Sequence, residues 1–319
     1  TQQPSGTRFG ANAIFNGENR QGGAMITYSI NKPEDKKEAI KEDKKKKDSK
    51  KKDETVTAKE EKPAVKYDSI IFEVFNDKNE LIRTIKEKAP KENGVHRMYW
   101  YMREKGKQRP SRRKARENAS EPRGVTVLPG TYKIKLHFGN QTKEETIKVA
   151  YDPRVEMPFE VLKNQYDLLK QLEDKMDVAG KATQQLLESK EIVEDYQKRL
   201  KAQKKKEKYE DLLKSHKEIL KSIDGLLDDM LGKEDKRQGI TDTEYPSTVS
   251  YLYTASRYIN SLLQNPGKTE TTLVKNADEK VSAVIAKINE FYKQDWPAYK
   301  ASVENLNLSP FEEVEELKY

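Results

Sequence analysis

The chain has 319 residues, of which 34% are apolar and 36% are charged. It contains no cysteine, which excludes disulfides, thiolate zinc sites and cysteine nucleophiles. Its net charge of +8 comes from 62 basic and 54 acidic residues, so the surface carries mixed charge and we expect no nucleic-acid partner. Sixteen tyrosines, eight phenylalanines and two tryptophans favour folded domains over a disordered chain. No apolar run is long enough to cross a membrane, so we expect no membrane span.

The first half of the chain reads as a β-domain. Residues 1–22 are rich in Gly, Asn and Gln and lack an initiator Met and a signal pattern. We therefore expect them to be a linker within a longer precursor. Strand patterns then recur at short spacing over residues 23–30, 69–76, 81–88, 95–103, 130–138 and 145–152. These strands favour an antiparallel β-sandwich of the fibronectin-III or immunoglobulin kind over residues 23–154.

Two charged insertions interrupt this predicted sandwich, over residues 31–64 and 104–124. The first holds 12 lysines and 10 acidic residues between positions 34 and 62, and so it has too few apolar side chains to offset its ordering entropy. The second is the most basic part of the chain. We expect both to be solvated segments between strands.

The second half, residues 155–308, reads as an antiparallel helical bundle. Apolar residues recur every seven positions, which predicts one helix over 158–204 that passes through Gly180 at a cost of about 1 kcal/mol. The residues that define this repeat are Leu162, Leu169, Leu172, Met176, Ala179, Thr183, Leu186, Val193 and Leu200. A helix this long needs helical partners.

Three shorter helices are expected as those partners. One covers residues 209–230, one starts at the N-cap Ser247, and one covers 273–296 until Pro297 breaks or kinks it. We expect an up-and-down arrangement, followed by an acidic tail over residues 309–319.

Catalytic chemistry leaves no recognisable trace in the sequence. His96, His137 and His216 have no partner at metal-ligand spacing, and no phosphate-binding, dinucleotide-binding, nucleophile-elbow or zinc-protease motif occurs. We predict no catalytic residue, no metal site and no cofactor, and we expect no enzyme activity in this chain.

Two groups of residues are candidates for binding. Tyr99, Trp100 and Tyr101 could stack on a sugar, although a sandwich core or a contact with a neighbouring domain would also use such aromatics. Arg109, Arg112 and Arg113 could contact a polyanion. They lack interleaved aromatic residues, so a solvated loop is the alternative.

Several runs resemble the C-terminal region of large sortilin-like, BNR-repeat β-propeller proteins of Bacteroidetes-type bacteria, which are often labelled glycosyl hydrolases. These runs are FNGENRQGGAMITYSI (15–30), FEVFNDKNELIRTI (72–85), GVHRMYWYMR (94–103), LPGTYKIKLHFGNQTKEETIKVAYDPR (128–154), FEVLKNQYDLLKQLEDKM (159–176) and DWPAYKASVENLNLSPF (295–311). The chain departs from the family where Asn19-Arg20-Gln21 replaces Asn-Pro-Pro, and its Lys-rich insertions are longer. We therefore expect the turn before the first strand to differ from that of the family.

The resemblance implies that the propellers lie upstream and carry any activity on glycans or peptides. This chain would then be a non-catalytic structural and interaction module. It would dock to the propeller of the same precursor or to another cell-envelope protein, in the periplasm, at the outer membrane or outside the cell. A carbohydrate-binding accessory module with a glycan ligand is the alternative.

Overall fold

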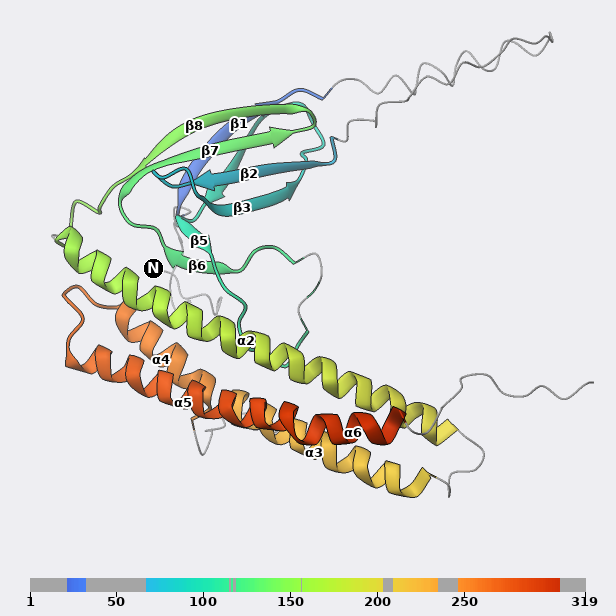
Figure 1. Cartoon of the computed structure of the whole chain (residues 1–319). Coiled ribbons are helices and arrows are strands. Elements are labelled where there is room, and N and C mark those ends of the chain that lie inside the picture. The colour runs from blue at the N-terminus through green and yellow to red at the C-terminus, as the bar shows by residue number, and fades with distance from the viewer. Residues whose placement is uncertain are drawn as a thin grey trace, which may run out of the picture. The chain divides into compact units, whose positions relative to one another are not determined.

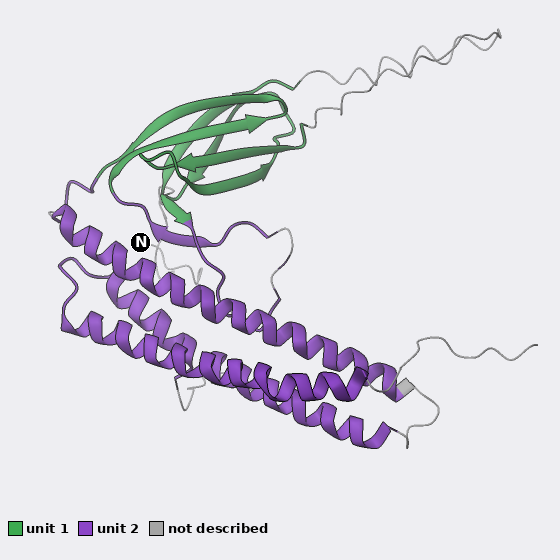
Figure 2. Ribbon diagram, in the orientation of Figure 1, with its two compact units in different colours: residues 1–104, 129–150 green, residues 105–128, 151–319 purple. Residues whose placement is uncertain are grey.

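The computed structural model describes residues 22–32, 67–114, 116, 119–155, 157–202, 209–234 and 246–304. Antiparallel strands come first and helices follow, which confirms the mixed α+β class (Figure 1). The chain divides into two compact units, shown in Figure 2. The β unit comprises residues 1–104 and 129–150, and the helical unit comprises 105–128 and 151–319. The expected linker over 1–22, the tail over 309–319 and the insertion over 31–64 lie almost wholly outside the described residues.

In the described part of the chain, eight strands form three antiparallel sheets. They are β1 (Ala24–Ile30), β2 (Ser69–Phe75), β3 (Leu81–Lys88), β4 (Gly94–Trp100), β5 (Arg103–Lys105), β6 (Arg123–Thr126), β7 (Gly130–Phe138) and β8 (Gln141–Val149). The sheet orders are β1-β4, β3-β2-β7-β8 and β5-β6. The first two sheets make up the β unit, in which more buried side chains alternate with less buried ones along β1 and β2.

The core of the β unit lies between the β1-β4 pair and the four-stranded sheet. Tyr28 on β1 contacts Phe72 on β2 edge to face, with ring centroids 5.2 Å apart. Trp100 on β4 meets Tyr132 on β7 in the same way at 5.4 Å. Edge-to-face pairs of this kind add to the stabilisation from buried area. The other buried apolar residues here are Ile30, Ile70, Val74, Met98, Ile134 and Phe138.

Two strand predictions differ from the structure, and one strand was missed. The strand predicted over 95–103 ends at Trp100, because Met102 has a φ of 55° that a continuing strand does not adopt. The strand predicted over 145–152 is β8, which begins four residues earlier, directly after the turn at Gly139 and Asn140. β6 was not predicted at all.

Five described helices make up most of the second unit. They are α2 (Phe159–Ala202), α3 (Glu210–Leu231), α4 (Thr248–Asn260), α5 (Lys268–Lys293) and α6 (Asp295–Glu304). The 44 residues of α2 correspond to about 66 Å at 1.5 Å per residue. Ser247 caps α4 as predicted, with its hydroxyl accepting a hydrogen bond from the Ser250 N–H.

The course of the helices differs from a simple up-and-down order. The Gln165 amide near the start of α2 donates to the Gln264 carbonyl just after α4, at 2.9 Å. The Thr248 hydroxyl at the start of α4 donates to the Asp229 carbonyl at the end of α3, at 2.8 Å. So α3 and α4 follow one another in the same direction, opposite to α2. Neither helix, with 22 and 13 residues, is long enough to cover α2 alone.

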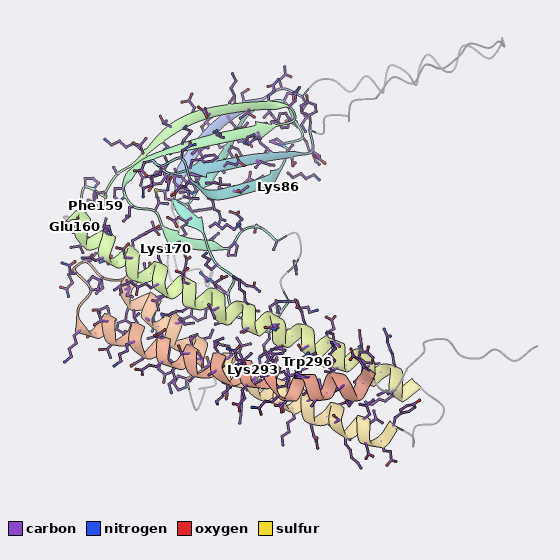
Figure 3. All side chains as sticks on the ribbon, viewed as in Figure 1. Lys86, Phe159, Glu160, Lys170, Lys293 and Trp296 are labelled. Carbon is purple, nitrogen blue, oxygen red and sulfur yellow. The ribbon has the colours of Figure 1, made fainter. Side chains whose placement is uncertain are left out.

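The fourth element of this arrangement, α5, runs in the same direction as α2. Lys175 on α2 pairs with Asp278 on α5, and Ser189 on α2 hydrogen-bonds Tyr292 on α5 at 2.8 Å. The helical chain is interrupted at Gln294, one residue before α6, and not after Trp296 (Figure 3). Pro297 lies in the first turn of α6, where no backbone N–H is required.

The seven-residue repeat of α2 forms the core of the helical unit. Its buried members are Leu169, Leu172, Met176, Ala179, Thr183, Leu186, Val193 and Leu200. Leu162 is only half-buried, and Val161 is buried in its place. The repeat therefore marks the face of α2 that packs on the other helices, as the sequence predicted.

Candidate anion-binding cleft

The segment over residues 105–128, here termed the strap, belongs to the helical unit. The Gln108 N–H donates to the Asp177 carboxylate on α2 at 3.3 Å, and Val125 is part of the helical core. The prediction of a solvated insertion within the sandwich was therefore wrong for the described part of 104–124. The charged composition gave no sign that hydrogen bonds, together with the adjoining buried Val125, hold this segment on the helical unit.

Gly180 on α2 allows the strap to lie close to the helix. A Cβ atom at this position would lie 2.5 Å from the Gln108 carbonyl oxygen. Such a separation is far shorter than any van der Waals contact, so only glycine fits without displacement of the strap. Gly180 was expected only to be a tolerated cost in the helix, and its close contact with the strap was not predicted.

Two basic residues of the strap attach it to the helices. The Arg112 guanidinium donates to the Asp228 carboxylate at 2.6 Å and also to the Gly232 carbonyl at the C-terminus of α3. A cation at a helix C-terminus is favourable because the carbonyl dipoles point toward it. Lys114 forms an ion pair with Glu191 on α2. Arg112, predicted as a polyanion contact, is thus already engaged within the protein.

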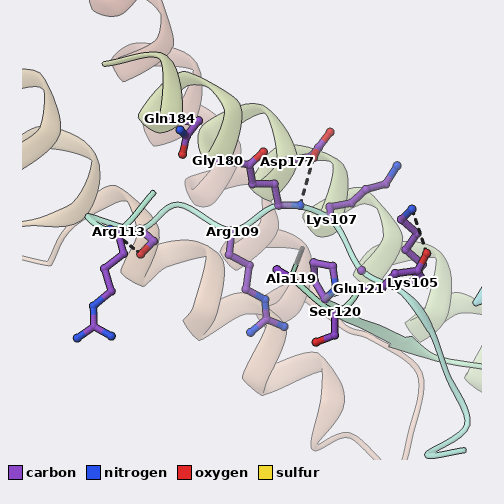
Figure 4. A pocket seen from close by; sticks show the side chains of 14 residues that line it. Lys105, Lys107, Arg109, Arg113, Ala119, Ser120, Glu121, Asp177, Gly180 and Gln184 are labelled. Carbon is purple, nitrogen blue, oxygen red and sulfur yellow. Dashed lines mark hydrogen bonds and ion pairs between the residues drawn. The ribbon is translucent and has the colours of Figure 1, made fainter. Parts of the chain in front are cut away.

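A cleft of about 570 Å³ lies between the strap and α2 (Figure 4). Its charged lining consists of the cations Lys105, Lys107, Arg109 and Arg113 and the acids Glu121 and Asp177. Arg109 and Arg113 extend to one side of the strap, and Lys107 points away from them (Figure 4). The structure therefore places two of the three predicted arginines on one side of the strap. Two lysines that the prediction did not include complete the charged lining of the cleft.

Both acids of the cleft already have cationic partners. Glu121 pairs with Lys105 at 3.1 Å, and Asp177 pairs with Lys181 at 2.7 Å. Burial acts to raise the pKa of Asp177, but hydrogen bonds from Lys181 and from the Gln108 N–H outweigh it and the pKa is lowered. Asp177 is therefore a firmly ionised acceptor that holds the strap.

The remaining cations keep their charge available. Lys107, Arg109 and Arg113 are exposed and form no ion pair with a carboxylate among the described residues. The Arg109 guanidinium donates to the Arg123 carbonyl at 3.3 Å, which fixes its position without neutralising it. The cleft can therefore bind an anionic group.

A smaller pocket of about 100 Å³ adjoins the cleft and shares Lys107 and Arg109 with it. Its other lining residues are Leu172, Glu173, Met176, Tyr253 and Ser256. Three of these supply apolar or aromatic surface. The pocket could receive one apolar side chain of a ligand whose acidic groups contact the two shared cations.

The predicted aromatic group does not form a single binding face. Trp100 is only 1% exposed, and its indole N–H donates to the Arg103 carbonyl at 3.1 Å. Tyr99 is half-buried and lies on the opposite side of β4, whereas Tyr101 is exposed beyond the end of that strand. Trp100 is thus a core residue and offers no face to a sugar.

The histidines have separate structural settings. His137 lies 2.8 Å from the Glu73 carboxylate, His96 contacts the Glu92 carbonyl at 3.0 Å, and His216 is buried between α3 and α6. In the part of the chain that the structure describes, no three His, Asp or Glu residues are placed to hold a metal ion. No described helix is both long and apolar enough to cross a membrane.

No protein-family model, curated protein or solved structure matches this chain. Exposed cations beside a pocket of mixed polar and apolar lining, on a segment fixed to a long helix, can serve as a binding surface.

Proposed function

We propose that this chain is a non-catalytic interaction module and that its strap cleft binds an acidic segment of a protein partner. The observation that carries the proposal is the cationic excess of the cleft, in which Lys107, Arg109 and Arg113 form no ion pair within 4.0 Å of a described carboxylate, although Lys107 lies close enough to Asp177 to lower the pKa of that carboxyl. Opposite charges across an interface set the encounter rate and the choice of partner more than the raw affinity.

The adjoining pocket supports a peptide-like partner over a uniform polyanion. Arg109 and Lys107 lie on both the charged cleft and the pocket that Tyr253 and Leu172 help to line. An acidic segment with one apolar side chain would satisfy both surfaces, with that side chain as its buried anchor.

The sequence resemblance supports a wider proposal. The sheet orders β4-β1 and β3-β2-β7-β8 are compatible with a fibronectin-III-like sandwich. We propose that the chain is the C-terminal part of an exported, sortilin-like β-propeller protein. Its partner would be the propeller or another envelope protein, in the periplasm, at the outer membrane or outside the cell.

The test is a titration with a polyglutamate peptide of the wild-type chain and of the double variant Arg109→Glu, Arg113→Glu. We expect the reversal to weaken binding at least about tenfold, which is about 1.4 kcal/mol. Lys217→Glu with Lys221→Glu is the matched control, because these exposed α3 lysines change the net charge equally without lining the cleft. An equal loss in both variants, or none in either, contradicts the proposal.

A second titration distinguishes the class of ligand. A single-stranded oligonucleotide carries similar charge without apolar side chains, and its binding should be weaker than that of an acidic peptide containing one leucine. Tyr253→Ala should remove the advantage of that leucine. If the oligonucleotide binds more tightly through Arg109 and Arg113, the partner is not an acidic protein segment.

A further inference from the structure

The two facing sheets of the β unit have unequal numbers of strands. β1 and β4 face a sheet of four strands, and among the described residues β1 pairs with β4 alone. A groove of about 380 Å³ lies between β1 and β8. Its apolar lining is formed by Phe72, Ile134, Leu136 and Ile147, with Tyr28 and Ile26 on the β1 side. Among the described residues, no strand pairs with the other edge of β1 or covers the inward face of β8 beside it.

The edge of β1 differs in composition from the other outer strands. β1 reads AMITYSI over seven residues, with no charge and no proline, and its register with β4 is unbroken. β3, β8 and β4 all carry charged side chains, and β2 and β3 also show a register shift. Proteins protect exposed edges from strand pairing with charges, prolines and bulges. Within Ala24–Ile30, the described β1 strand has none of these protections.

We propose that the β1 edge is a strand-addition site, at which an extended segment of a partner polypeptide pairs with β1 and fills the groove. This inference builds on the proposed function as an interaction module and names a second docking surface. Backbone hydrogen bonds to the edge would supply affinity, and side chains that enter the groove would supply selectivity.

The lining of the groove defines the chemistry of the partner. Side chains alternate along a strand, so every second residue of the added segment would meet Ile134, Leu136 or Ile147. On β8, Lys143 and Glu145 lie opposite Leu136 and Ile134 and form no ion pair with a described residue. The best partner alternates apolar residues and carries an acid near Lys143 and a base near Glu145.

A second copy of this chain fits the groove poorly. If two β1 strands paired edge to edge, the second β1 would lie over β8 of the first copy. The inward side of that β1 already packs on its own four-stranded sheet, as the Tyr28–Phe72 contact shows. Both sheets cannot occupy the same space, so a single extended segment is the occupant that fits.

The probe is a capped peptide of seven residues, the length of β1, that alternates valine and threonine. We expect the full chain to bind this peptide. A version that is N-methylated on every amide facing β1 should bind at least about tenfold more weakly. Methylation of the opposite set of amides should leave the affinity almost unchanged, because those amides point away from the edge. Titration calorimetry would give all three affinities.

Two variants of β8 test the groove itself. Ile147→Lys should weaken the peptide at least about fivefold, since it replaces an apolar lining residue, whereas Lys148→Thr on the other face of β8 should not. No peptide binding, or equal loss with both methylation patterns, would overturn the proposal. A dimer in sedimentation that excludes the peptide would also overturn it. Polyglutamate binding at the cleft reports separately on the proposed function.

Discussion

At the scale of single residues, two helical glycines provide a matched comparison. Alanine is about 1 kcal/mol better than glycine inside a helix. At Gly225 on α3 a Cβ would meet nothing within 4 Å, so Gly225→Ala should raise the free energy of unfolding by about that amount. At Gly180 the same Cβ would overlap the Gln108 carbonyl, and overpacking costs about 1–3 kcal/mol.

Gly180→Ala should therefore lower stability or release the strap, despite its gain in helix propensity. Urea denaturation of both variants measures the difference, and protease sensitivity of the strap identifies its cause. An equal stabilisation of the two variants would show that the strap does not lie against α2.

His216 is buried, and neither of its ring nitrogens nor the Tyr299 hydroxyl beside it has a hydrogen-bond partner of good geometry among the described residues. Burial lowers the pKa of His216, and the opposing effect of the Leu212 carbonyl is smaller. The unfolded chain, with a histidine pKa of about 6.5, then binds more protons than the folded chain below that pH. The contribution of His216 to the free energy of unfolding should be fully present above about pH 6.5 and should fall as the pH decreases below that value.

His216→Phe removes the titrating group and retains an aromatic contact with Tyr299, whose ring centroid lies 5.3 Å away. Between about pH 6.5 and pH 5, the stability of the variant should decrease much less than that of the wild-type chain. Thermal denaturation across that interval gives the result. An unchanged pH dependence would place the acid-sensitive group elsewhere.

At the scale of elements, Arg112 links the strap to the end of α3. Arg112→Ala removes the charge at the α3 C-terminus and the ion pair with Asp228. The pair is partly exposed, so the expected loss of stability is only about 1 kcal/mol, with faster proteolysis of the strap. Arg113→Ala is the control, because the exposed Arg113 side chain makes no such contact, and it should change stability by less than about 0.5 kcal/mol.

Elements with a strong local pattern were predictable from the sequence. The expected helix over 158–204 is α2 within two residues at each end, because its apolar repeat is carried by the segment itself. β8 was misplaced because Gln141 to Thr146 are exposed on both faces and so show no alternation. β6 has four residues, too few for a pattern.

The candidate site was predictable only in part. The basic cluster indicated Arg109 and Arg113 as candidates for contact with a polyanion. Local composition could not indicate which contacts they make in the folded chain. Arg112 contacts Asp228, and Gln108 contacts Asp177, which are far away in the chain. Such contacts depend on the fold of the helical unit. The only sequence signal of the strap contact was a glycine within an otherwise regular helix. A glycine at such a position can also be present without any contact.

At the scale of the whole molecule, the main change concerns the boundary between the units. The sequence placed residues 23–154 in one sandwich, whereas residues 105–128 belong to the helical unit. The chain therefore leaves the β unit, forms the strap, returns for β7 and β8 and then enters α2. The strap supplies most of the charged cleft, so the proposed binding function depends on this assignment.

Native-state hydrogen exchange of the strap amides tests this assignment most directly. The Gly106 N–H donates to the Pro122 carbonyl at 2.9 Å, and the Gln108 N–H donates to Asp177. Both amides should be protected, and Asp177→Ala should release Gln108 while Gly106 stays slow. Exchange of both amides at the rate of a free loop in the wild-type chain would show that the strap, and with it the cleft, is not a fixed part of the helical unit.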